Sequence, residues 1–198
     1  THSFQNAIDP ARVDAVARAA GFTLAGMAAV PESGSPEDQE ERERFAEWIE
    51  AGRAGEMQYL QRRDEAGRLL RSSVRVVFPW ARSVIVCAAN YNSDQPRSTD
   101  PAAANAGWIA RYAWTGQASG DGERATDYHK VLRRRLEAVR AAVAEEAGAF
   151  ESRCFVDTGP VVERVYARYA VLGWTVKNTC LIHHQLSSWL VLGVMVTS

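Results

Sequence analysis

The sequence predicts a single α/β (α+β) domain over residues 1–198, in which helices flank a mixed β-sheet. Three observations support this fold class. The 198 residues are 46% apolar, which suffices for one sizeable core. Apolar runs of strand length intermingle with longer segments of helical periodicity. The order follows no strict βαβ rhythm, and the last two runs are typical of a hairpin rather than a crossover unit.

The front of the chain is predicted to contain two helices around one strand. Helical spacing of apolar residues marks the helices at 11–20 and 35–52, and the apolar run 22–30 is typical of a strand. Ser35 can cap the second helix, with Pro36 at its first position. The buried face of this helix is predicted to consist of three apolar residues, Phe45, Trp48 and Ile49.

The middle of the chain is predicted to supply the centre of the sheet. Residues 82–91, RSVIVCAANY, form a nearly continuous apolar run, which indicates a strand covered on both faces. A loop by composition follows at 93–107, and GWIARYAW, 107–114, has strand-like character. Residues 115–126, TGQASGDGERAT, are rich in glycine and small polar residues and predict an exposed insertion.

The last third is predicted to form two helices and three strands. The helices are expected at 127–147 and at 160–172, the second with Pro160 as its first residue. The strands are expected at 153–157, 179–183 and 188–196. Four apolar residues share one face of the first helix: Leu132, Leu136, Val139 and Val143.

Composition excludes several classes of protein. The 23 Lys and Arg residues against 24 Asp and Glu leave a net charge of −1, so the chain is no polycation, and any anion site must be local. No apolar stretch approaches the roughly 20 residues that cross a bilayer, and we expect a cytoplasmic protein without a membrane partner. The basic residues either belong to solvated helix faces or contact an RNA backbone: Arg68, Arg71, Arg75, Lys130, Arg133, Arg134 and Arg140.

Cysteine and histidine usage predicts no metal site in this chain. Cys87, Cys154 and Cys180 are widely separated and form no CxxC motif, so we interpret them as buried small residues. The pair His183–His184 has no third ligand at a recognisable spacing. His129, near a helix start, is interpreted as a packing or capping residue.

Asp157, in FVDTGPVVER, is the candidate catalytic residue. It ends a predicted strand just before a helix, where ligands tend to collect, and Gly159 allows a tight turn or a close approach. The alternative is that Asp157 caps the turn or the helix. An aspartic acid, with a reference pKa of about 3.9, donates a proton near neutral pH only when burial or a nearby anion raises that pKa. Glu163 and Arg164 are expected to give salt-bridge or cap-like support.

Two further segments carry candidate binding residues. Arg111 lies beside Tyr112 between two tryptophans, and it could grip a phosphate or carboxamide oxygen or form a cross-strand ion pair. Lys177–Asn178 are expected at the start of a strand and are uninformative by themselves.

Taken together, WIARYAW, DYHKVLRRRL, FVDTGPVVER, LGWTVKNTCLI and SSWLVLG resemble the epoxyqueuosine reductase family in order and rough spacing. The resemblance implies a cobalamin-binding catalytic domain, related to corrinoid reductive dehalogenases and nitroreductase-like folds. It further implies a downstream ferredoxin-like module with two 4Fe-4S clusters and a helical-repeat tail, both absent from these 198 residues. The implied reaction reduces epoxyqueuosine to queuosine at the wobble position of a tRNA anticodon stem-loop, in a protein expected to be a monomer.

The resemblance also assigns roles to residues. Asp157 matches the family's proton donor, and the corrin would supply a water-poor wall beside it. The implied cobalamin contacts are Arg71, Ala110, Arg111, Tyr112, Asp157, Lys177, Asn178, Ser188 and Trp189. Val176 and Ser187 depart from the family pattern, which usually has glycine at both positions, and Val176 could narrow the site.

Two other functions stay open at this point. One is a corrinoid- or flavin-dependent reductase of a small molecule. The other is a non-catalytic module that binds corrinoid or tRNA. Retention of flavin instead of cobalamin would favour the first, and tRNA or corrinoid binding without turnover would favour the second.

Overall fold

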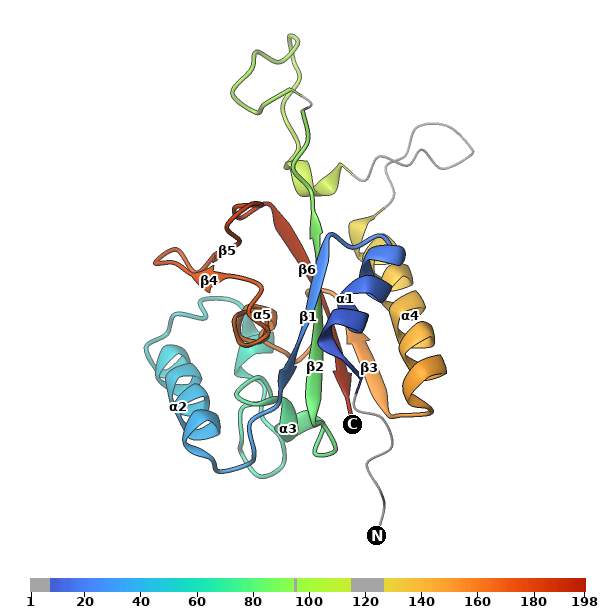
Figure 1. The fold of residues 1–198 in the computed structure, drawn as a ribbon. Coiled ribbons are helices and arrows are strands. Elements are labelled where there is room, and N and C mark those ends of the chain that lie inside the picture. Colours follow the sequence, from blue (N-terminus) through green and yellow to red (C-terminus); the bar gives the residue numbers. More distant parts are fainter. Residues whose placement is uncertain (1–7, 95, 115–126) are drawn as a thin grey trace.

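The computed structural model describes residues 8–94, 96–114 and 127–198, and Figure 1 shows a central sheet with helices on both faces. The helices of this part are α1 (Pro10–Ala19), α2 (Pro36–Glu50), α3 (Val74–Val77), α4 (Tyr128–Ala147) and α5 (Glu163–Tyr169), with the 3-10 turns η1 (Gln58–Gln61) and η2 (Arg111–Ala113). The strands are β1 (Leu24–Ala29), β2 (Ser83–Asn90), β3 (Ser152–Phe155), β4 (Trp174–Thr175), β5 (Leu181–Ile182) and β6 (Leu190–Thr197). The predicted α/β class with flanking helices is confirmed.

β2 and β6 form the middle of the four-stranded sheet, whose order is β1-β2-β6-β3. The central position predicted for 82–91 is confirmed, since β2 is buried at every position from Val84 to Ala89. The sheet is antiparallel rather than mixed as predicted, because β6 lies between β2 and β3 and runs opposite to both. β1 is likewise antiparallel to β2.

Each face of the sheet has its own apolar core. On one face, α1 and α4 pack against the strands through fully buried residues such as Val13 and Leu136. On the other face, α3 and α5 contribute Val74 and Ala167. Successive side chains of a strand point to opposite faces, so β2 feeds both cores. The predicted buried face of α4 is confirmed at Leu132, Leu136, Val139 and Val143.

The start of α2 follows the prediction, but its packing does not. Ser35 accepts a hydrogen bond from the Asp38 amide (3.3 Å), and Pro36 is the first helical residue. The fully buried residue of α2 is Asp38, whose carboxylate accepts from the Gly34 amide (3.1 Å) and pairs with Arg42 (2.8 Å). The predicted buried face is wrong, because its members are only partly buried: Phe45, Trp48 and Ile49.

Residues 107–114 contain the turn η2 instead of the predicted strand. The side chains of this segment bond to nearby backbone rather than to a strand partner, since Trp108 Nε1 donates to the Asp100 carbonyl (2.9 Å) and Trp114 Nε1 to the Ile109 carbonyl (3.0 Å). The predicted insertion at 115–126 lies outside the described residues.

The predicted hairpin at the end of the chain is wrong. β5 pairs with β4 in a separate two-stranded sheet, whereas β6 pairs with β2 and β3. The helix predicted at 160–172 corresponds to α5, which begins at Glu163 rather than at Pro160. Of the three cysteines predicted to be buried, Cys87 is buried, and Cys154 and Cys180 are partly buried.

Val171, two residues after the end of α5, adopts a backbone conformation that suits glycine. The Leu172 amide donates to the Ala167 carbonyl and the Val171 amide to the Arg168 carbonyl, both at 3.0 Å, with Val171 at φ 58°. Val171 is 87% exposed, so its side chain gains little from packing there. We expect Val171→Gly to raise the free energy of unfolding by about 1 kcal/mol, measured by urea denaturation. Val171→Ala should gain less, and a loss of stability in the glycine variant would contradict the expectation.

Candidate functional site

Three of the candidate residues, Asp157, Tyr112 and Trp189, lie at the end of the sheet where β2 ends and β6 begins. Asn90, the last residue of β2, lies opposite Leu190, the first of β6, and β3 ends at this side with Phe155. In Figure 1 this end of the sheet lies at the top, below η2 and beside the first turn of α4. The segments that leave β2 and β3 therefore meet the first turn of α4 here.

Asp157 lies in a sharp turn just after β3. Its φ is 60°, and the Thr158 amide donates to the Val156 carbonyl (2.7 Å), which closes a three-residue turn around it. A Cβ at Gly159 would lie 2.4 Å from the Phe155 ring, so glycine permits the chain to fold back on β3. The Asp157 side chain is 72% exposed. A strained, exposed carboxylate of this kind is characteristic of functional turns.

The interpretation of Asp157 as a helix cap is wrong. α5 begins only at Glu163, and no backbone amide in the described ranges donates to the Asp157 carboxylate. Its Oδ2 lies instead 3.4 Å from the Tyr128 hydroxyl and 3.8 Å from His129 Nε2, both in the first turn of α4. Asp127 is the N-cap residue of α4, and its Oδ1 lies 2.9 Å from His129 Nδ1, so His129 contacts the cap instead of supplying it.

The Tyr128 hydroxyl keeps its proton and donates a hydrogen bond to Asp157 over the whole physiological range. Burial, followed by the neighbouring Asp157 carboxylate, raises the pKa of Tyr128 to about 12. The hydrogen bond of His129 lowers the pKa of Asp127, which therefore stays ionised beside the imidazole. The arrangement orients Oδ2 of Asp157 while leaving the rest of its carboxylate open to solvent.

A chain of aromatic rings connects this carboxylate with the start of β6. Tyr128 contacts Tyr112 edge-on (5.5 Å between ring centroids), Tyr112 contacts Tyr91 (6.4 Å), and Tyr91 contacts Trp189 (5.4 Å). Tyr112 and Trp189 stay 45% and 37% exposed. An accessible aromatic surface therefore adjoins Asp157.

Arg111 supports the loop that carries Ala110 and Tyr112. Its guanidinium donates to the carbonyls of Ser93 (2.8 Å) and Pro96 (2.9 Å). It also lies 5.4 Å from the ring centroids of both Trp114 and Trp189. A role in anchoring this loop thus accompanies whatever ligand contact Arg111 makes.

Lys177 and Asn178 lie in the turn between β4 and β5, not at the start of a strand as predicted. Both are exposed, and the Asn178 side chain accepts from the Cys180 amide (3.1 Å). Cys180 is near enough to Tyr91 to add to the effect of burial, which raises the pKa of that tyrosine. Lys177 and Asn178 are therefore open to solvent in this turn.

The two departures from the family pattern differ in their consequences. Ser187 has φ 54°, a left-handed value for which glycine is better suited. Val176 does not have a positive φ, so its branched side chain causes no backbone strain. Ser188, next to Trp189, is partly buried.

Glu163, the first residue of α5, is influenced by the charges of both Arg71 and Asp157. The Arg71 guanidinium is 5.2 Å from the Tyr59 ring centroid. Burial raises the pKa of Glu163, the nearby Asp157 adds to this rise, and Arg71 opposes it. The predicted salt bridge of Glu163 or Arg164 is not formed among the described residues, since Arg164 bonds to Thr179 instead.

Glu163 predicts a pH dependence of stability. A raised pKa means that the folded state binds this proton more tightly than the unfolded state, so stability falls as the pH rises above the ordinary value of 4.5. We expect Glu163→Gln to abolish this fall. The free energy of unfolding of the variant, relative to that of the wild type, should therefore be higher at pH 7 than at pH 4. Urea unfolding at the two pH values measures this difference. An identical pH profile for the two proteins would contradict the expectation.

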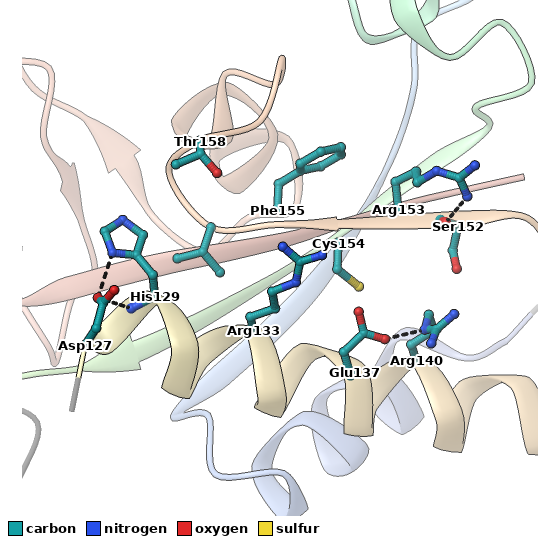
Figure 2. A pocket seen from close by; sticks show the side chains of 11 residues that line it. Asp127, His129, Arg133, Glu137, Arg140, Ser152, Arg153, Cys154, Phe155 and Thr158 are labelled. Atoms are coloured by element: carbon teal, nitrogen blue, oxygen red, sulfur yellow. Dashed lines mark hydrogen bonds and ion pairs between the residues drawn. The ribbon is translucent and has the colours of Figure 1, made fainter. Parts of the chain in front are cut away.

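A surface pocket of about 670 Å³ opens between α4 and β3, next to the Asp157 turn. Figure 2 shows Asp127 and His129 at one end, and Arg133 rising from α4 towards β3. Further along, Glu137 pairs with Arg140 (2.7 Å). The pocket joins the candidate catalytic turn to the basic side of α4.

The predicted basic surface divides into paired and exposed residues. Arg68 pairs with Asp64 (2.7 Å), and Arg75 donates to the Pro31 carbonyl (2.9 Å). The members that are exposed and form no ion pair with another described residue are Lys130, Arg133 and Arg134.

The sequence analysis did not identify two residues of the aromatic chain beside Asp157, Tyr91 and Tyr128. Tyr91 follows the predicted central strand directly, and Tyr128 belongs to the segment DYHK at the predicted helix start. A position beside a strand end or a helix start could have marked each residue as a candidate. The contacts between their rings and distant segments, however, leave no pattern in the sequence. Among the described residues, every helix is too short or too polar to span a membrane.

The family model described as "Epoxyqueuosine reductase QueG, DUF1730" matches residues 71–158. Curated epoxyqueuosine reductases from Synechocystis sp. and Gloeobacter violaceus are both 36% identical to this chain, over 173 and 191 residues. The alignments cover 87% and 95% of this chain, but 52% and 51% of the relatives. The chain thus spans about half the length of the curated relatives it matches.

Solved structures share the fold. An epoxyqueuosine reductase from Streptococcus thermophilus has a TM-score of 0.70 at 20% identity, covering 94% of this chain and 45% of that one. Two others have TM-scores of 0.64 at 22% identity and cover 94% of this chain and 44% of theirs. One is an epoxyqueuosine reductase with an epoxyqueuosine-modified tRNA stem loop, and the other, from Bacillus subtilis, has its catalytic aspartate loop swung out of the active site.

Proposed function

This chain belongs to the epoxyqueuosine reductase family, and from that premise we propose that it is the cobalamin-binding catalytic domain of an enzyme that reduces epoxyqueuosine to queuosine in tRNA. The observation that carries the proposal is Asp157, a strained and exposed carboxylate beside an accessible aromatic surface. The catalytic aspartate loop of the Bacillus subtilis relative can leave its active site. An exposed three-residue turn such as that of Asp157 would permit a similar movement.

The residues around the end of the sheet where β2 ends and β6 begins fit a corrinoid. A flat macrocycle with polar substituents needs apolar faces at its centre and hydrogen-bonding groups at its rim. Exposed rings of Tyr112 and Trp189 offer the faces, next to the small Ala110. The polar groups that would meet the rim are Arg71, Lys177, Asn178 and Ser188, with Arg111 holding the loop. Bound there, cobalamin would supply the reducing cobalt centre.

Asp157 would donate the proton that the reaction needs first, once the bound corrinoid shields its exposed carboxylate from water. Removal of an epoxide oxygen as water consumes two electrons and two protons, and the carbon–oxygen bond breaks more easily when the oxygen is protonated. Tyr128 keeps its own proton and orients Oδ2 of Asp157. The electrons would come from the 4Fe-4S clusters that the family resemblance implies outside residues 1–198.

The proposed macromolecular partner is tRNA. An epoxyqueuosine reductase of the same fold has been solved with a modified tRNA stem loop. Here, Lys130, Arg133 and Arg134 place positive charge on α4, and Arg133 lines the pocket that reaches Thr158 in the Asp157 turn. Such charge would attract the phosphates that flank the modified nucleotide.

Two measurements test the proposal. Cobalamin added anaerobically should co-elute with this chain and change its visible spectrum. A protein that also contains the cluster module should convert epoxyqueuosine-tRNA to queuosine-tRNA. Retention of flavin in place of cobalamin would instead indicate a reductase of another kind, and binding without conversion a non-catalytic module.

A further inference from the structure

The Lys177–Asn178 turn belongs to a hairpin that needs support from elsewhere. β4 and β5 pair through two residues each, Trp174 with Ile182 and Thr175 with Leu181. An isolated two-stranded hairpin is marginally stable in water, and this one is very short. A further contact must therefore keep the turn in one conformation.

Thr179 is the strained residue of the turn. Its φ is 65°, a left-handed value that is unfavourable for a β-branched residue. Its amide donates to the Val176 carbonyl (2.8 Å), so this conformation closes the turn that exposes Lys177 and Asn178. If Thr179 relaxed to an ordinary φ, the turn would open.

Arg164 of α5 holds Thr179 in this conformation. Its Nη1 donates to the Thr179 carbonyl oxygen (2.6 Å) and to the Thr179 hydroxyl oxygen (2.9 Å). Two bonds from one charged nitrogen restrain the backbone and the side chain of the same residue. Arg164 is the second residue of α5, so this contact ties the Lys177–Asn178 turn to the helix that follows the Asp157 turn.

We propose that Arg164 and Thr179 form a latch that sets the Lys177–Asn178 turn in its corrinoid-binding conformation before the cofactor arrives. Arg164 is a positioning residue and acts through Thr179. The inference rests on the proposed function, because it takes the corrinoid as the group that meets this turn. A turn that is already ordered loses less conformational entropy on binding, so the latch increases affinity.

The test is an anaerobic titration with cobalamin, followed by visible absorbance. Arg164→Ala is expected to weaken binding roughly tenfold, the typical effect of a lost charged hydrogen bond. Thr179→Gly keeps the carbonyl acceptor and adopts a left-handed φ easily, so it should bind almost as tightly as the wild type. In that background, Arg164→Ala should cost much less than in the wild type. Arg18→Ala, an exposed arginine of α1, is the matched control.

A second readout needs no cofactor. Amide hydrogen exchange at Val176, Thr179 and Cys180 should accelerate in Arg164→Ala, because their hydrogen bonds close the turn. Unchanged exchange, or unchanged affinity in a protein whose wild type binds cobalamin, overturns the latch and leaves the proposed function intact. If Arg164→Ala weakens cobalamin binding equally in the wild type and in the Thr179→Gly background, Arg164 contacts the cofactor directly. This result would also overturn the latch. A wild type that binds no corrinoid defeats the proposed function, and with it the latch's role in binding.

Discussion

Replacing Asp157 with asparagine is expected to slow the conversion of epoxyqueuosine-tRNA by at least about 100-fold, because a general acid typically contributes that much or more. Asparagine is nearly the same size and also tolerates a φ of 60°, so the turn should survive. Tyr128 can still donate to the amide oxygen. Single-turnover rates should be measured in a protein that contains the cluster module, with cobalamin affinity determined in parallel.

Thr158→Ala provides the matched control, since Thr158 is exposed and adjacent in the same turn. It should keep most of the rate. A wild-type rate in Asp157→Asn would remove the aspartate from the proton-transfer step. A rate lost together with cobalamin binding would make Asp157 a structural or binding residue instead.

Replacing Gly173 with alanine is expected to have the largest effect on the β4–β5 hairpin that carries Lys177 and Asn178. A Cβ at this position would lie 2.2 Å from the carbonyl oxygen of Ile182 and 2.9 Å from its carbonyl carbon. Both are backbone atoms of the strand that pairs with Trp174, so β4 and β5 must separate to relieve the clash. We expect a loss of about 3 kcal/mol in the free energy of unfolding, at the upper end of overpacking costs. If the hairpin opens locally instead, cobalamin binding should be lost with little global destabilisation.

Urea unfolding and the cobalamin titration together distinguish the two outcomes. Gly107→Ala is the control, because a Cβ there meets nothing within 4 Å. A Gly173→Ala protein with unchanged stability and unchanged affinity would show that the close approach to Ile182 has no energetic consequence.

The periodicity of the sequence predicted the elements whose burial is one-sided or complete. α4 shows its stripe at Leu132 and Leu136, and β2 its continuous apolar run, so both could be placed. α2 has the same kind of stripe, yet the residue it buries is Asp38. Periodicity cannot reveal that exception, because a network of polar partners makes the burial possible. The partners of β5 and β6 were equally hidden, since pairing between strands depends on segments distant in sequence.

The candidate site was predictable only where a local rule applied. Gly159 next to Asp157 indicated a tight turn, and that turn is present. The start of α5 was misplaced because Pro160 suits a first helical position but does not require one. The contacts of Arg111 with loop carbonyls, and of Asp157 with Tyr128, join segments far apart in the chain. Neither leaves a spacing that a sequence can display.

The place of β6 in the sheet has a consequence for how the chain folds. β6 lies between β2 and β3. Thr197 of β6 pairs with Ser83 of β2, which lies 114 residues earlier in the chain. During synthesis, β1 and β2 can pair early, but the inner edge of β2 stays uncovered until Leu190–Thr197 emerges from the ribosome. Contacts so distant in sequence form slowly, and an unpaired apolar strand is prone to associate with other chains in the meantime. Nascent chains of this protein should therefore be most vulnerable to aggregation just before β6 is made.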